Sequence, residues 1–600
     1  MTHTTAIVVA TLVVVAPQSY GRPAQALEYE INLNDRTDDL FRVTLRVNGL
    51  PDSSAIYQFA ATAPGTYQVM DIGRYVRSFV ALGAKNDTLP VHRISMNQWR
   101  IGRPASVRMV VYTIAETWDT PMDSNRIYAM CGTSMEDDHV LLNPHCVIGY
   151  PTGMQQSPIH LRLLRPPAWA VGTALEPDDA GGFVAPDYDR LVDSPILLGR
   201  LSCAGLTIGG SSVEVFTYSK TDKVHSDDIL GALRGILYAS AAFMHGLPVQ
   251  RYTFLFHCDR VNAGAWEHSY SSEYVYRESD FDRNLPGMIS SNVAHEFFHI
   301  VTPLHIHSQV IDRFNFVTPV PSKHLWLYEG VTEWAADIVR LRGGLISLPD
   351  YLSHIRRKLL VNDRMDKQVS LEEIALSCYT PEGQRQYANI YDRGAVIAAL
   401  LDIRLLSLSG GTWGLREVIN ELAARYGPHK AFDEATFYDS VVSMTHPSIG
   451  SFINSYIRGA EPLPVAEVFS LVGISYREEV EGAGEVSTTG FRARPHGESF
   501  EIVSVEEKAA AFGLQKGDTV VAINGTELTP ATAGALYGTL RAEAPGSSYT
   551  VTVRRAGERE RTLTCALLGT PEVTRHVLEV MPDPTPEQRR LRAAWMTNLN

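Results

Sequence analysis

Two histidines four residues apart are the first feature of this sequence that could do chemistry. The segment His295-Glu-Phe-Phe-His299 contains the pattern His-Glu-x-x-His. On a helix, residues four apart lie on the same face, so His295 and His299 can present their imidazoles to one metal ion. Neutral imidazoles suit zinc, and a catalytic zinc needs one more protein ligand and an open position for water. Glu296 would lie beside that position, where its carboxylate can take a proton from the water.

Candidates for the third ligand follow the histidine pair. Glu329 and Glu333 are four apart in the apolar, helix-patterned segment 325–334. One of them can ligate the metal while the other orients a ligating histidine. A lone carboxylate among such apolar side chains would be costly, which favours a functional role over a solvated acidic face. The spacing alone leaves His305, His307 and Glu333 as rivals of Glu329 for the third position.

The elements that must position these residues change character along the chain. Residues 27–219 read as short alternating strands, which predicts an all-β domain of sandwich type. From 220 to 478 the spacing is mostly helical, with a buried strand at 252–256 that continues into the segment 264–268. An edge strand just before the histidine helix is where an extended peptide substrate could pair.

The sequence of the C-terminal part indicates a smaller, separate domain. Segment 481–489 is rich in Gly, Glu and Ser and indicates a linker. Residues 485–570 predict a β-rich domain of ordinary size, and residues 571–600 a C-terminal tail.

Length and charge limit the function classes. A chain of 600 residues suggests roughly three or four domains. The net charge of -14 argues against a nucleic-acid-binding surface. The apolar run 6–16 is too short for a stable membrane anchor but fits a signal peptide, with cleavage after Ala26. We therefore expect residues 1–26 to be a signal peptide of an exported protein, in the bacterial periplasm or secreted, with no transmembrane segment.

The six cysteines are widely spaced and contain no Cys-x-x-Cys pair, which disfavours a cysteine zinc site. Cys131 and Cys146 are close enough in sequence for a disulfide in an exported protein. Equally, all six could be small buried side chains.

The two motifs together resemble those of a known family. His295-Glu-Phe-Phe-His299 with Leu325-Trp-Leu-Tyr-Glu-Gly-Val-Thr-Glu333 is similar to the glycyl aminopeptidase family of zinc peptidases, which are thermolysin-like gluzincins related to aminopeptidase N. The resemblance covers most of the chain. It implies an N-terminal all-β domain, a mostly helical, thermolysin-like catalytic domain and a C-terminal PDZ domain. It also implies one Zn²⁺ held by His295, His299 and Glu329, with Glu333 in support.

Two further segments carry the resemblance to substrate binding. Tyr391, in Tyr-Asp-Arg-Gly-Ala, looks like the tyrosine that stabilises the oxyanion, and Tyr387 is its rival. The segment Gly264-Ala-Trp-Glu-His resembles the Gly-Ala-Met-Glu-Asn exopeptidase motif. That likeness implies that Gly264, Ala265 and Glu267 bind substrate, with Glu267 holding the free α-ammonium.

The expected function is therefore a zinc aminopeptidase acting on peptides with a free N-terminus, with small first residues such as Gly and Ala. The segment 513–518 is typical of bacterial PDZ domains, and Thr489-Gly490-Phe491 is the expected loop for a peptide C-terminus. One alternative is an endopeptidase, if Glu267 does not face the ammonium. Another is a catalytically idle scaffold that binds peptides through the PDZ module.

Overall fold

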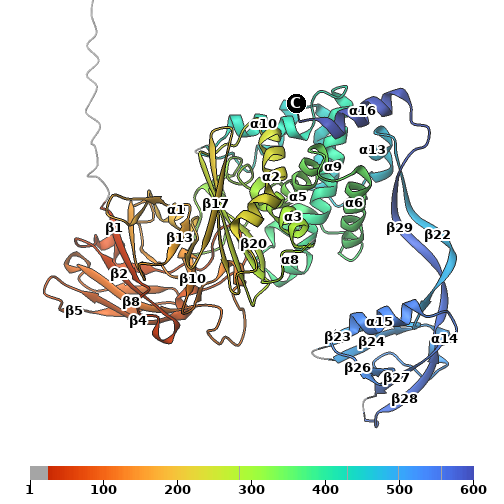
Figure 1. Cartoon of the computed structure of the whole chain (residues 1–600), viewed down its shortest axis with the longest axis horizontal. Coiled ribbons are helices and arrows are strands. Elements are labelled where there is room, and N and C mark those ends of the chain that lie inside the picture. Colours follow the sequence, from red (N-terminus) through yellow and green to blue (C-terminus); the bar gives the residue numbers. More distant parts are fainter. Residues whose placement is uncertain (1–24, 283, 429, 497–498, 556, 600) are drawn as a thin grey trace, which may run out of the picture. The chain divides into compact units, whose positions relative to one another are not determined.

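The computed structural model describes residues 25–282, 284–428, 430–496, 499–555 and 557–599 (Figure 1). The chain divides into two compact units, one of residues up to 464 together with 586–600, the other of residues 465–585. The expected signal peptide, apart from its last two residues, lies outside the described residues. Among the helices of the described ranges, none has the length and apolarity to cross a membrane.

The N-terminal part of the first unit is β-rich, as predicted, and consists of three sheets with a short helix, α1 (Tyr188–Val192). The alternation of apolar and polar residues at the start of this part corresponds to strands with one buried face, because Tyr29, Ile31 and Phe41 point into one shared core. The first sheet runs β14 (Glu176–Pro177), β15 (Phe183–Ala185), β12 (Ile159–Leu164), β1 (Leu27–Asn32), β2 (Leu40–Arg46), β8 (Met109–Ala115), β4 (Val76–Leu82) and β5 (Thr88–Leu89). The second runs β11 (Tyr150–Pro151), β3 (Ile56–Gln58), β7 (Gln98–Ile101) and β6 (Val91–Arg93), and the third β13 (Ala170–Thr173), β16 (Ile196–Gly199), β10 (His139–Leu142) and β9 (Ser134–Met135).

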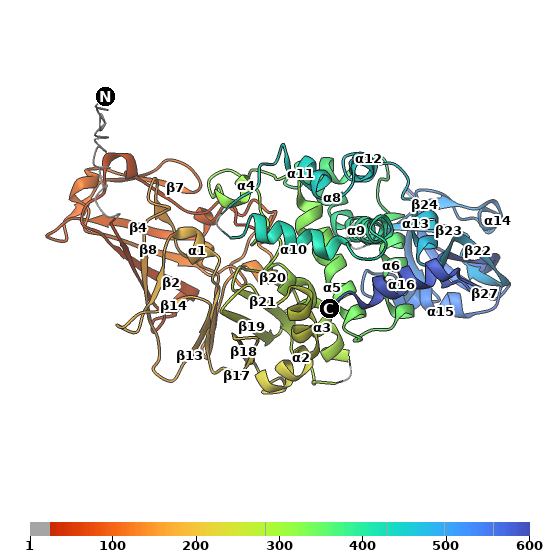
Figure 2. The same ribbon diagram turned by 90° about the horizontal axis from the view of Figure 1, so that it is seen from above.

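A five-stranded sheet connects this β-rich part to the helices. Its order is β17 (Ser202–Ile208), β18 (Ser211–Ser219), β19 (Arg251–Asp259), β21 (Ser271–Arg277) and β20 (Gly264–Glu267). β18, which the sequence assigned to the N-terminal domain, pairs in parallel with β19. Helices α2 (Ser226–Phe243) and α3 (Asn284–Phe298) pack against this sheet (Figure 2). A cluster of Leu141, Leu197 and Leu255 joins this sheet to the third sheet. β20 is the last strand in the order and is therefore an edge strand.

The helical part surrounds one central helix, α9 (Ala388–Leu408), which is apolar on most sides and therefore buried. It contacts a π-helical turn, η7 (Trp326–Gly330), and helices α5 (Val331–Arg342), α6 (Leu348–Asn362) and α16 (Pro586–Thr597). The remaining helices are α4 (Gln309–Asp312), α7 (Leu371–Leu376), α8 (Pro381–Gln386), α10 (Leu415–Arg425), α11 (Phe437–Met444) and α12 (Pro447–Tyr456). Two glycines allow η7 and α9 to touch, since a Cβ added to Gly330 would lie 2.7 Å from Cα of Gly394.

The second unit contains a six-stranded sheet and a long two-stranded ribbon. The sheet is β23 (Phe491–His496), β24 (Ser499–Val505), β25 (Thr519–Ile523), β27 (Ser548–Arg554) and β28 (Arg561–Ala566), with β26 (Thr526–Glu527) on β25. Its helices are α13 (Val465–Leu471), α14 (Glu507–Ala510) and α15 (Ala533–Ala542). The linker predicted at 481–489 is wrong, because these residues lie in or next to β22 (Ile474–Thr488), which pairs with β29 (Leu568–Val580). The partner strand is about ninety residues away, so local composition carries no sign of it.

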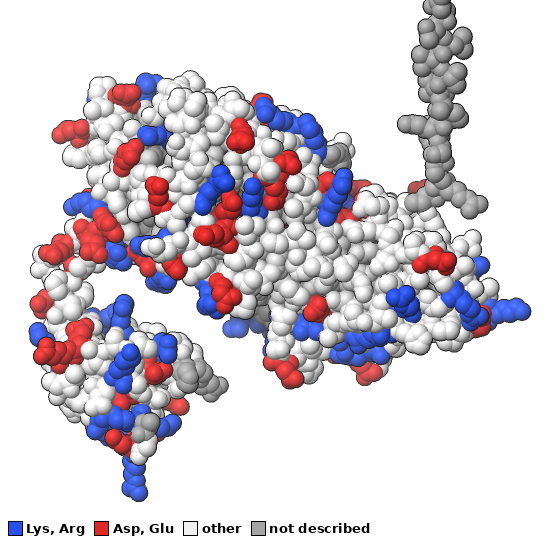
Figure 3. All heavy atoms as spheres, turned by 180° about the vertical axis from the view of Figure 1, so that it is seen from behind, with Lys and Arg blue, Asp and Glu red and all other residues white. Residues whose placement is uncertain are grey.

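All six cysteines are free thiols, and Cys146 Sγ donates a hydrogen bond to the backbone oxygen of Cys131 at 3.3 Å. Acidic and basic side chains are interspersed over the face of the molecule in Figure 3.

Candidate functional site

Three donor atoms converge where α3 ends and η7 passes. Glu329 Oε2 lies 3.5 Å from His295 Nε2 and 3.6 Å from His299 Nε2. Ligand atoms about 2.0–2.2 Å from a tetrahedral centre are roughly 3.3–3.6 Å apart, so these separations fit a zinc ion. His299 and Glu329 are buried, and burial lowers the pKa of His299 to about 4, which keeps its ring in the neutral form that ligates.

Hydrogen bonds fix the other side of each imidazole. His295 Nδ1 lies 2.8 Å from Glu333 Oε2, and His299 Nδ1 lies 2.7 Å from the backbone oxygen of Thr302. Burial favours the neutral acid at Glu333, but the ammonium of Lys358 beside it holds the pKa of Glu333 below its usual range. A charged Glu333 thus orients His295, the arrangement usual for metal-ligating histidines.

Glu296 and Tyr391 line the cavity beside these donors, which has a volume of about 220 Å³. Burial raises the pKa of Glu296 to about 7. The Tyr391 ring lies 5.7 Å from that of His295, centroid to centroid. Burial and the carboxylates of Glu329 and Glu267 raise the pKa of Tyr391, so its hydroxyl keeps its proton. The rival Tyr387 lines the same cavity, with its ring 5.7 Å from Tyr391.

Glu267 faces the same space from β20. Because side chains alternate along a strand, Trp266 points into the N-terminal core and anchors the strand there. Single ligand atoms of Glu267, Glu296 and His299 all lie within 4.8 Å of one another. Burial, followed by the charges of Glu329 and Glu296, raises the pKa of Glu267 well above its usual value. Such crowded carboxyl groups favour a bound cation.

The remaining predicted site residues lie either at the cavity or away from it. Ala265 lines the cavity, while Gly264 begins β20 with a φ of +104°. The rival ligands point elsewhere: His305 Nδ1 faces the backbone oxygen of Ile300 at 2.6 Å, and His307 Nε2 lies 3.6 Å from Asp312.

The sequence reasoning missed Tyr67, which comes from the N-terminal β-rich part. Its hydroxyl donates to Glu329 Oε1 at 3.1 Å, the carboxylate oxygen opposite the one that faces the histidines. Its backbone oxygen accepts from Gln384 Nε2 at 3.1 Å, and its ring lies 5.3 Å from that of Tyr387. No local pattern marks Tyr67, since 262 residues separate it from Glu329.

The loop that carries Tyr67 passes very close to Glu267. Gly65 has a φ of +75°, and a Cβ added there would collide with the Glu267 carboxylate and lie 2.8 Å from Trp266 Nε1. The N-terminal part therefore forms one wall of the site.

Comparisons with known proteins find similarity in two segments of the chain and in its fold. Residues 28–200 match the Peptidase M61 N-terminal domain, and residues 289–397 match the M61 glycyl aminopeptidase domain. An aminopeptidase N family protein from Idiomarina loihiensis has the same fold, with a TM-score of 0.77 and 22% identity over 95% of this chain and 100% of that one. An M1 zinc metallopeptidase from Deinococcus radiodurans aligns at a TM-score of 0.47 and 10% identity, over 74% and 95% of the two chains. A comparison with curated proteins found no match.

Proposed function

We propose that this chain, a metallopeptidase carrying both M61 domains, is a zinc aminopeptidase that removes small N-terminal residues such as Gly and Ala from peptides. The observation that carries the proposal is the position of Glu267, whose carboxylate lies within 4.8 Å of ligand atoms of Glu296 and His299. A carboxylate so close to the donor cluster can hold a free α-ammonium only when the first peptide bond is at the metal. This distance would make the enzyme an exopeptidase.

The proposed metal ligands are His295, His299 and Glu329, whose donor atoms have the separations described above. One zinc ion bound there would polarise the scissile carbonyl and lower the pKa of the attacking water. Glu296 would accept the proton of that water and pass it to the leaving amine. Its pKa of about 7 before the metal binds suits both steps.

Two other side chains would act on the substrate. The hydroxyl of Tyr391, which keeps its proton, would donate to the oxygen on which negative charge develops. Glu267 would bind the α-ammonium through a charge-assisted hydrogen bond, with β20 as the edge strand that receives the peptide backbone.

A panel of matched free and N-acetylated peptides tests the proposal. The purified protein should cleave only the free-amine peptides and should lose activity with a chelator. Glu296→Gln should keep its zinc and lose turnover by orders of magnitude, because the base is gone. Equal cleavage of blocked and free peptides would instead support an endopeptidase. Absence of bound zinc from the purified protein would support the idle scaffold.

We also propose that the second unit is a PDZ-type module that binds a peptide C-terminus. A groove of about 610 Å³ lies beside edge strand β23 and α15, with Thr489, Phe491, Tyr537 and Leu540 among its walls. The backbone N–H groups of the loop at Gly490 would receive the carboxylate. A library of free-carboxylate peptides and their C-terminal amides should bind the full protein only in the free-carboxylate form.

Export rests on the N-terminal apolar run alone. N-terminal sequencing of the mature protein from its natural source should begin at residue 27, and an intact Met1 would contradict export.

A further inference from the structure

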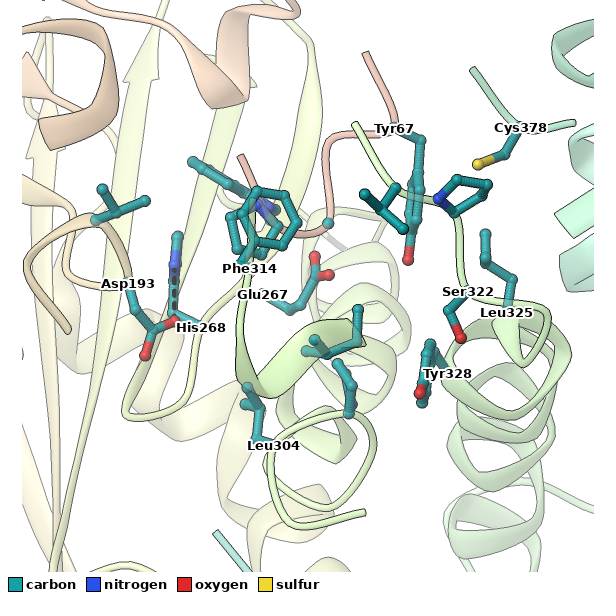
Figure 4. A pocket seen from close by; sticks show the side chains of 18 of the residues that line it. Tyr67, Asp193, Glu267, His268, Leu304, Phe314, Ser322, Leu325, Tyr328 and Cys378 are labelled. Carbon is teal, nitrogen blue, oxygen red and sulfur yellow. Dashed lines mark ion pairs between the residues drawn. The ribbon is translucent and has the colours of Figure 1, made fainter. Parts of the chain in front are cut away.

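A cluster of buried polar side chains lies outside the walls of the peptidase site. The pocket drawn in Figure 4 shares Tyr67 and Glu267 with the metal-site cavity and therefore belongs to that site. His139, His257 and Asp259 line neither space. Single ligand atoms of these three residues all lie within 4.8 Å of one another, and each residue is at most 3% exposed. The reaction proposed above does not use them.

Two sheets bring the three residues together. His257 and Asp259 are two apart on β19, the central strand of the five-stranded sheet, so they lie on the same face of that strand. That face also carries Leu255 and packs on the third sheet, whose strand β10 supplies His139. Tyr218, directly opposite His257 on β18, stacks on the ring of His139 at 3.7 Å between centroids. The cluster therefore forms where the N-terminal β-rich part meets the five-stranded sheet.

Asp138 determines which nitrogen of His139 faces the cluster. His139 Nδ1 lies 2.9 Å from Asp138 Oδ1, and the hydroxyl of Tyr218 donates to the same carboxylate at 3.1 Å. A carboxylate on the far ring nitrogen is a usual partner of a metal-ligating histidine. His139 Nδ1 therefore carries the proton, and its Nε2 presents a lone pair to the cluster. Burial lowers the pKa of both His139 and His257, so both rings stay in the neutral form that ligates.

The two imidazoles can hold one ion after a small movement. His257 Nε2 lies 2.8 Å from His139 Nε2, the distance of an N–H···N hydrogen bond. An ion about 2.0–2.1 Å from each nitrogen in a tetrahedral site would hold them roughly 3.3–3.4 Å apart, so the rings must separate by about 0.5 Å. The proton on His257 Nε2 would pass to Nδ1 of the same ring, which has no hydrogen-bond partner within the described residues. The ring stays neutral through this change.

Lys220 provides the positive charge that the buried carboxylate needs. Its ammonium lies 2.7 Å from Asp259 Oδ1, and its side chain is 50% exposed, whereas that of Asp259 is 1% exposed. A buried carboxylate without a counter-charge would be costly. Because a half-exposed lysine can turn its ammonium into water, a metal ion can take its place at Asp259.

We propose that His139, His257 and Asp259 form a second metal site, which binds a divalent transition-metal ion such as zinc and releases Lys220 from Asp259. Two imidazoles and one carboxylate are a donor set that suits zinc. The ion would link β10 to β19 and so stabilise the junction of the two sheets. The proposal does not depend on the peptidase function, because the site shares no residue with the donor cluster at α3 and η7.

Zinc titration of the full chain tests the site. A background variant, His299→Ala with Glu329→Ala, lacks two donors of the peptidase site. Calorimetry should therefore count one bound zinc per chain in this background and two in the metal-stripped wild type. Adding His139→Gln and His257→Gln to the background should remove the remaining zinc. Zinc should also raise the midpoint of thermal unfolding of the background variant but not of the combined variant, because only a ligand that binds the folded chain stabilises it.

Lys220→Gln tests the displaced ammonium without a change in the core. In the same background it should lower the zinc Kd by roughly two- to fivefold, the strength of an exposed ion pair. Lys223→Gln is the matched control, because Lys223 is similarly exposed, at 48%, and pairs with Asp280 at 2.8 Å instead. It should leave the zinc Kd unchanged.

Three results would overturn the second site. The first is a background variant that binds no zinc. The second is a folded combined variant that keeps its zinc, which would show an adventitious site elsewhere on the chain. The third is a zinc Kd for Lys220→Gln equal to that of its background, and this measurement decides the matter even if the two glutamine substitutions prevent folding.

Discussion

His295 of α3 and His299, directly after its end, each direct one ring nitrogen to the donor cluster and the other to a hydrogen bond within the protein. The two outer partners differ, since His295 faces the carboxylate of Glu333 while His299 faces a backbone oxygen. Glu333 is in turn paired with Lys358, so its negative charge is balanced before any metal binds. Within the described residues no lysine pairs with Glu329, whose two oxygens face the histidines and Tyr67. We therefore expect the two acids, four residues apart, to have different roles.

The first prediction separates these tasks. Glu329→Ala should abolish stable zinc binding because it removes a donor atom. Glu333→Ala should keep the site but weaken it by about 10–100-fold, the usual effect of losing a residue that orients a ligand. Titration of the purified variants with a zinc chelator measures both affinities. If Glu333→Ala emptied the site while Glu329→Ala retained zinc, the assignment would be reversed.

The second prediction concerns Tyr67. Tyr67→Phe removes the hydrogen bond to Glu329 and little else, so zinc affinity should fall by roughly tenfold, as expected for a hydrogen bond to a charged group. Tyr238→Phe, on an exposed face of α2, is the matched control and should bind zinc like the wild type. Equal zinc affinities in all three proteins would show that the Tyr67 contact does not support the ligand.

At the scale of elements, two close contacts align the site. Glu329 lies in a π-helical turn, a rare conformation that often occurs at functional sites. That turn rests directly on α9, because Gly330 and Gly394 bring the two backbones together. Since α9 also carries Tyr391, the contact sets the spacing between Tyr391 and the donor cluster.

The third prediction tests this contact. In Gly394→Ala, the new Cβ would lie 2.9 Å from Cα of Gly330, so η7 and α9 must separate. The free energy of unfolding should fall by about 1–3 kcal/mol, the usual cost of overpacking, and turnover should fall with it. Gly231→Ala on α2 is the control, because its Cβ meets nothing and alanine favours a helix by up to about 1 kcal/mol. Denaturant unfolding of the two variants should therefore show shifts of opposite sign.

At the scale of the whole molecule, the chain leaves the first unit at residue 464 and returns to it at 586. The returning helix, α16, buries Trp595 completely, and the backbone oxygen of Trp595 accepts from Arg342 Nε at 2.8 Å. Arg342 is also paired with the buried Asp402 of α9 at 2.8 Å. The expected tail is thus part of the core that supports α5 and α9.

The fourth prediction follows from that burial. Trp595→Ala should lower the free energy of unfolding of the first unit by about 3–5 kcal/mol, the range for a buried aromatic side chain. Trp413→Ala, at a position 37% exposed, should cost far less. Thermal unfolding followed together with zinc retention measures the effect. Similar midpoints for the two variants would mean that α16 is not part of the stabilising core.

The local patterns of this sequence were sufficient for several features. The spacing of His295 and His299 predicted a shared helix face, and alternation at β1 and β2 predicted a half-buried sheet, because both depend on neighbours a few residues apart. The motif around Glu329 and Glu333 named the two acids that lie beside His295, and the resemblance it carries agrees with the matched M61 domains.

What depends on distant parts of the chain was decided only by the tertiary structure. Composition made residues 481–489 look like a linker, although most of them lie in a strand that pairs with another about ninety residues away. Tyr67 and Gly65 reach the site through a loop of the N-terminal β-rich part, and Tyr67 contacts Glu329 across 262 residues of sequence. Short-range periodicity reports only which face of an element is buried, whereas a pocket or a cross-domain hydrogen bond requires the packing of elements that the sequence separates by hundreds of residues.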